Sequence, residues 1–62
     1  MDILMIESAL QYTWQHNINH DVGSEVEGFE LACIAMKHSI ERKYPHYDTE
    51  QFMMNIFGES YE

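Results

Sequence analysis

The sequence predicts an all-α fold, a small three-helix domain with a long central helix at about Ser24–Lys43. Apolar residues recur at steps of three and four over most of the chain, which is the period of one face of an α-helix. No segment shows the strict apolar–polar alternation of a half-buried strand. We therefore expect helices at about 3–17, 24–43 and 49–57, followed by an acidic tail at 58–62, within one domain spanning 1–62.

The first expected helix has an unusually wide apolar side. Ile3, Ile6 and Leu10 follow the helical period, and Asp2 is a suitable N-cap. Further apolar residues widen this side beyond a narrow stripe: Leu4, Met5, Ala9 and Tyr12. A wide apolar side predicts contact with two neighbours, which are the other two helices or a second copy of the chain.

The long helix follows a loop of Asn, Asp, Gly and Ser residues. Ser24 and Glu27 have the spacing of a capping box at its start, and Tyr44 before Pro45 ends it near Lys43. One narrow stripe predicts the core: Val26, Phe29, Cys33, Met36 and Ile40.

This helix also has a second apolar face, made by Leu31, Ala32, Ile34 and Ala35. The two faces together predict that the helix is covered on two sides, with the other helices packed across it. Gly28 interrupts the helix and is interpreted either as a tolerated defect or as a point where another backbone approaches closely.

The third helix is short and strongly apolar. Asp48 is a suitable N-cap with Gln51 at the capping-box position, and Gly58 ends the helix. Its apolar face consists of Phe52, Met53, Ile56 and Phe57.

Charge is the strongest signal in the composition. The 62 residues contain eleven Asp and Glu against three Lys and Arg, which gives a formal net charge of −8. Such a surface repels nucleic acid and anionic membranes, so we expect neither direct nucleic-acid binding nor membrane binding. It attracts a protein with a basic surface patch.

The supply of large apolar side chains leads us to expect a homodimer. Five Met, four Tyr, three Phe and one Trp are many for 62 residues, and helices one and three carry more of them than three short helices can hide. The one cysteine excludes an intramolecular disulfide and suits a reducing cytoplasm. We see no secretory signal, and no apolar run approaches the ~18 residues that cross a bilayer.

Residues that suggest chemistry are few. His16 and His20 stand four apart, which is the spacing of a shared metal on a helix, but His20 lies in the expected loop. Cys33 is on the core stripe, where an apolar environment makes a thiol inert. Paired carboxylates need a cleft of ~300 Å³, for which three short helices leave little room. We therefore expect no enzyme and no cofactor.

The sequence thus favours a small acidic protein that binds another protein stoichiometrically, as an inhibitor, adaptor or regulator. The expected partner-binding residues are the acids Glu25, Glu27 and Glu30 with the aromatic anchors Trp14, Tyr47 and Phe57. Two alternatives remain open: a DNA mimic that occupies a nucleic-acid-binding partner, and a metal-binding regulator that uses His16 and His20.

In size, charge and lack of catalytic motifs, though in no motif of its own, the chain resembles the short acidic proteins that phages and mobile elements make to block a host factor. The resemblance implies an inhibitor of a host protein.

Overall fold

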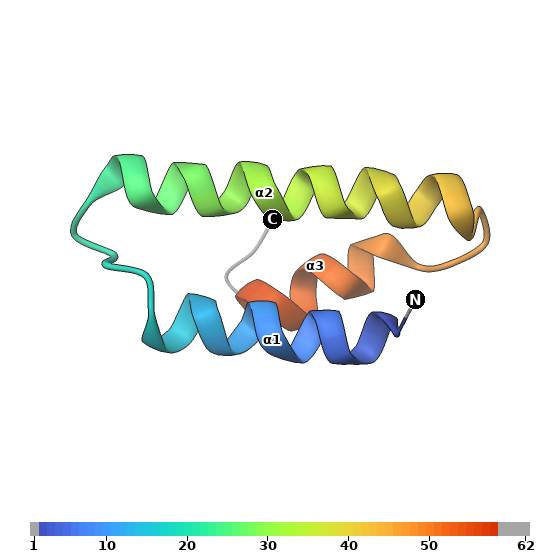
Figure 1. Cartoon of the computed structure of the whole chain (residues 1–62), viewed down its shortest axis with the longest axis horizontal. Coiled ribbons are helices and arrows are strands. Elements are labelled where there is room, and N and C mark those ends of the chain that lie inside the picture. Colours follow the sequence, from blue (N-terminus) through green and yellow to red (C-terminus); the bar gives the residue numbers. More distant parts are fainter. Residues whose placement is uncertain (1, 59–62) are drawn as a thin grey trace.

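The structure is a computed structural model that describes residues 2–58. Within that range the chain forms three helices and no strand: α1 (Ile3–His16), α2 (Gly23–Lys43) and α3 (Thr49–Phe57). α1 and α2 run antiparallel, and α3 lies between them (Figure 1). The predicted all-α fold with the longest helix in the middle of the chain is confirmed. The predicted tail beyond Gly58 lies outside the described residues.

Two of the three predicted N-caps are confirmed. The Asp2 carboxylate accepts a hydrogen bond of 3.1 Å from the backbone N–H of Met5. The Asp48 carboxylate accepts one of 3.1 Å from the N–H of Gln51. Each bond satisfies one of the N–H groups that a helix leaves without a partner at its start. α3 ends at Gly58, whose φ of 79° is open to glycine at little cost.

The predicted cap at Ser24 is wrong. α2 begins at Gly23, and its N-cap is Val22, which has no side-chain cap bond. The loop holds this end of the helix instead, because the Asn19 N–H donates to the Glu25 carboxylate at 2.9 Å. The Val22 carbonyl accepts the first backbone bonds of the helix, from the N–H groups of Glu25 and Val26 at 3.1 Å.

The short helix α3 is the packing centre of the molecule. Phe52, Met53, Ile56 and Phe57 are all buried, as predicted for its apolar face. α2 contributes Cys33 and Ile40 to the core, and no residue of α1 is fully buried. α3 packs against both α1 and α2 (Figure 1). The core is centred on α3 because this helix concentrates its large apolar residues within nine positions.

The two apolar faces of α2 have different environments. On the predicted core stripe, Cys33 and Ile40 are fully buried, while Phe29 and Met36 are half-buried and pack against the core. The second face is exposed, with Leu31 at 58% and Ile34 at 37%. The prediction that α2 is covered on two sides is therefore wrong for the single chain.

Polar contacts tie α3 to both neighbours. The Asn55 amide donates to the Glu7 carboxylate of α1 at 3.0 Å. On the other side, the buried Thr49 hydroxyl donates to the Glu41 carboxylate of α2 at 3.0 Å. These bonds satisfy polar groups at the helix contacts, which supports a defined position for α3.

Candidate partner-binding surface

The acids that the sequence singled out lie in the first half of α2, on its surface. Glu25, Glu27 and Glu30 are all exposed, and within residues 2–58 none of them forms an ion pair. Glu25 is oriented by its bond from the Asn19 N–H. At 3.6 residues per turn, Glu25 and Glu27 point about 160° apart, so these acids surround this end of the helix rather than forming one flat face.

The bases are largely occupied by contacts within the chain. Lys37 pairs with Glu50 of α3 at 3.7 Å, and Arg42 donates to the Ser39 hydroxyl at 3.3 Å. Lys43 lies over the Tyr44 ring, 5.9 Å from its centroid. Since all three bases belong to the second half of α2, the charge of this helix changes from acidic to basic along its length.

Two of the three expected aromatic anchors point into the molecule. Trp14 stacks on Phe29 with ring centroids 5.6 Å apart and meets the edge of Phe57 at 4.8 Å. Phe57 is only 7% exposed and Trp14 is half-buried. This cluster joins the three helices at one end of the molecule, so Phe57 offers little surface to a partner. Tyr47, at 36%, is the exposed member of the expected set.

A different set of apolar side chains is exposed on α1. Leu4, Met5 and Tyr12 are 69%, 68% and 60% exposed. They are the residues that widen the apolar side of the first helix in the sequence, so the signal was visible there. What the sequence did not show is that α3 covers only the opposite side of α1, which leaves this row without a neighbour.

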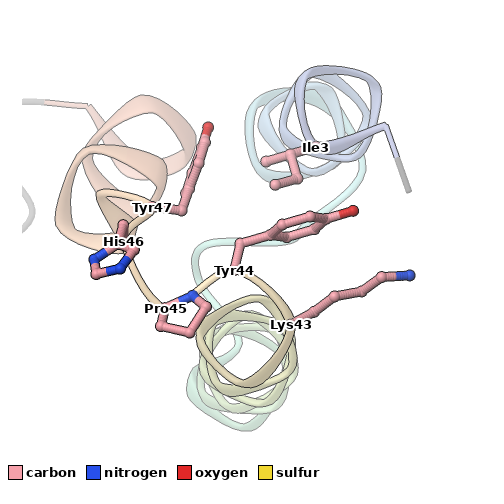
Figure 2. Close-up of a pocket in the computed structure, with 6 residues that line it drawn as sticks. All are labelled: Ile3, Lys43, Tyr44, Pro45, His46 and Tyr47. Atoms are coloured by element: carbon pink, nitrogen blue, oxygen red, sulfur yellow. The ribbon is translucent and has the colours of Figure 1, made fainter.

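An open groove lies where the start of α1 meets the loop after α2. It has a volume of about 440 Å³ and is lined by Ile3, Lys43, Tyr44, Pro45, His46 and Tyr47. Figure 2 shows Tyr47 standing across the gap from Ile3 and Tyr44. The expectation that three short helices leave little room for a cleft of ~300 Å³ is therefore wrong. Among residues 2–58 the lining contains no carboxylate, so no paired acids of acid–base catalysis from this range are placed here.

The two histidines of the metal hypothesis have other contacts. His16 is the last residue of α1 and packs its ring against Tyr12, 4.5 Å between centroids. His20 lies beyond the helix, and its Nε2 is 2.8 Å from the Trp14 carbonyl oxygen. Their spacing is therefore not helical. Among residues 2–58, no group of three or more His, Cys, Asp or Glu side chains is arranged to hold a metal ion.

Two groups within the described part of the chain have shifted pKa values. Burial raises the pKa of the Cys33 thiol to about 11, with a smaller contribution from the nearby Glu30 charge. Cys33 is 0% exposed, so the thiol is both protonated and inaccessible. The hydrogen bond from Thr49, followed by the one from His38, lowers the pKa of Glu41. Neither shift creates a nucleophile or a base for catalysis.

No protein-family model matches the chain, and no curated protein and no solved structure is significantly similar to it. No helix within residues 2–58 is long and apolar enough to cross a membrane.

Proposed function

We propose that this protein binds another protein stoichiometrically and acts as an inhibitor, adaptor or regulator. The observation that carries the proposal is the exposed row of Leu4, Met5 and Tyr12 on α1, on a chain with a net charge of −8. Several large apolar side chains exposed on one side of a helix are typical of sites that a partner covers. Tyrosine, leucine and methionine supply the apolar contact area that such an interface needs.

The charge supports a partner with a basic surface patch. Glu25 and Glu30 are exposed and take part in no ion pair among the described residues, so their charge is not balanced locally. Unbalanced acids speed the encounter with a basic surface more than they hold the finished complex. In this proposal the acids therefore steer the partner, and the α1 row retains it.

The DNA-mimic alternative predicts a different use of the acids. A mimic needs carboxylates on one face at spacings near those of phosphates, and the orientation of Glu25 about 160° from Glu27 does not favour one. If the acids carried the affinity themselves, salt would weaken equilibrium binding steeply, and the protein would displace DNA from its partner.

The test is affinity capture from the source cell, with the partner identified by mass spectrometry and then purified. Three baits are compared: the wild type, the double variant Leu4→Ser/Tyr12→Ser, and the single variant Met54→Ser. The Met54 variant is the matched control, because Met54 is also exposed, at 43%, but lies on α3. We expect one partner to bind wild type and the Met54 variant but not the α1 double variant. A partner that binds all three baits equally would refute the role of the α1 row.

A further inference from the structure

The side of α2 that faces away from the other helices carries a second uncovered row. In Figure 1, α2 runs along one edge of the molecule, with α1 and α3 both on its other side. The row consists of Glu27, Leu31, Ile34 and His38, at steps of four, three and four. These are the steps of a coiled-coil seam. Leu31 is 58% exposed, Ile34 37%, and the His38 side chain 61%.

Small residues flank the two apolar members of this row. Gly28 and Ala35 lie one turn before and one turn after Leu31, and both are exposed. A Cβ added at Gly28 would meet nothing within 4 Å, so the glycine is not required by any contact within the chain. Because the distance between packed helices depends on the side chains at their contact, this stretch of α2 admits another helix at close range.

Charges of opposite sign lie at the two ends of this row. Glu27 lies at one end, and His38 and Arg42 lie at the other. Within the chain, the His38 Nδ1 is 3.1 Å from the Glu41 carboxylate, which also accepts a hydrogen bond from Thr49 of α3. In an antiparallel pair, Glu27 of each copy meets His38 and Arg42 of the other. Helical side chains lean toward the N-terminus of their own helix, so Glu27 and Arg42 of opposing copies lean toward each other. A parallel pair would instead place Glu27 against Glu27.

We propose that this row is the seam of a two-fold homodimer, in which two α2 helices pack antiparallel through Leu31 and Ile34. A two-fold interface requires a surface that complements itself, and the outer side of α2 offers an exposed apolar row with opposite charges at its two ends. The exposed row on α1 does not have an acid at one end and a base at the other, so we assign this row to the heteropartner. The homodimer and the heteropartner therefore use different surfaces, and each proposal stands or fails without the other.

The structure also places the surplus of large apolar side chains on a different pair of helices from the pair that the sequence predicted. The sequence assigned it to helices one and three, but Met54, at 43%, is the one large apolar side chain exposed within α3, Thr49–Phe57. Most of the exposed large apolar side chains among the described residues lie on α1 and on the outer side of α2. The net charge of −8 on each copy opposes association, so the test is made at physiological ionic strength, where the Debye length is about 8 Å.

The experiment is sedimentation equilibrium of the whole chain and of five variants. We expect wild type to approach twice the 7.4 kDa monomer mass as its concentration rises. Leu31→Glu should weaken the dimer by about 30-fold or more, because it buries an unpaired charge in the seam. Leu4→Glu is the matched control, since Leu4 is equally apolar and 69% exposed, and it should leave the dimer intact. Circular dichroism checks that each variant keeps its helices.

The charge swap tests the antiparallel direction. Glu27→Arg and Arg42→Glu should each weaken the dimer, and the double variant should restore it, because each contact then has its charges exchanged. Three results would overturn the proposal: a monomer at every concentration, a dimer lost in Leu4→Glu but kept in Leu31→Glu, or a double swap no stronger than either single change.

Discussion

Replacing Phe52 by Ala tests whether α3 is the packing centre. Phe52 is 0% exposed, and removing a buried Phe side chain costs about 3–5 kcal/mol through lost burial and the cavity left behind. A chain of 62 residues has a total unfolding free energy of about 3–9 kcal/mol. The change therefore removes about a third of the stability or more. Phe29 is only half-buried at the end of the molecule, so Phe29→Ala should cost less, about 1–2 kcal/mol.

The assay is urea unfolding followed by circular dichroism, at one protein concentration for all variants because dimerisation makes stability concentration-dependent. With a urea slope of about 1 kcal/mol per M for so small a chain, Phe52→Ala should lower the midpoint by ~3 M or leave no folded baseline. Leu4→Ala, at an exposed position, should change the unfolding free energy by no more than about 0.5 kcal/mol. If Phe29→Ala proved more destabilising than Phe52→Ala, α2 rather than α3 would be the centre of the core.

Three further predictions concern caps and ionisable groups. Asp48→Ala should cost about 1 kcal/mol of stability in the same urea assay, while Ser24→Ala should cost almost nothing, since Ser24 makes no cap bond; equal losses would contradict the observed start of α2. Cys33 should react slowly with a thiol reagent at neutral pH until urea opens the fold. Its raised pKa predicts stability that is complete below the ordinary thiol pKa of 9.0 and is lost as pH rises toward about 11; an alkaline unfolding series checks this, and a flat profile would contradict it. Thr49→Val should raise the lowered pKa of Glu41, as followed by NMR titration of its carboxyl carbon. The stability that this carboxylate adds above its ordinary pKa should then fall less as the solution is acidified, because the hydrogen bond from His38 remains.

The helices could be predicted because their signals are local. The period of Phe29, Cys33, Met36 and Ile40 identifies a helix wherever it packs, and Asp2 and Asp48 lie at positions where a carboxylate reaches an unpaired N–H. Ser24 failed as a cap because the loop between Asn19 and Val22 holds the start of α2 through its own hydrogen bonds. That arrangement depends on how the loop folds back and not on the spacing of residues.

The candidate surface was harder to predict because burial is a tertiary property. α2 has two apolar faces, and nothing in their spacing says that α3 covers Cys33 and leaves Leu31 exposed. Trp14 and Phe57 were expected on the surface. They belong to different helices, α1 and α3, and the fold packs their rings against each other. The exposed acids were predictable, since three glutamates near the start of a helix have few ways to be buried.

Association kinetics with the captured partner, measured over a series of salt concentrations, test the functional account most directly. The account predicts that association slows as salt shortens the Debye length from ~10 Å at 0.1 M to ~3 Å at 1 M, while dissociation changes little because apolar contacts hold the complex. The double variant Glu25→Gln/Glu30→Gln changes two acids that lie outside the proposed dimer seam. In this variant the association rate should depend less steeply on salt concentration. Association that is independent of salt, and equal in the wild type and the double variant, would contradict the account and leave the α1 row as the whole of the recognition surface.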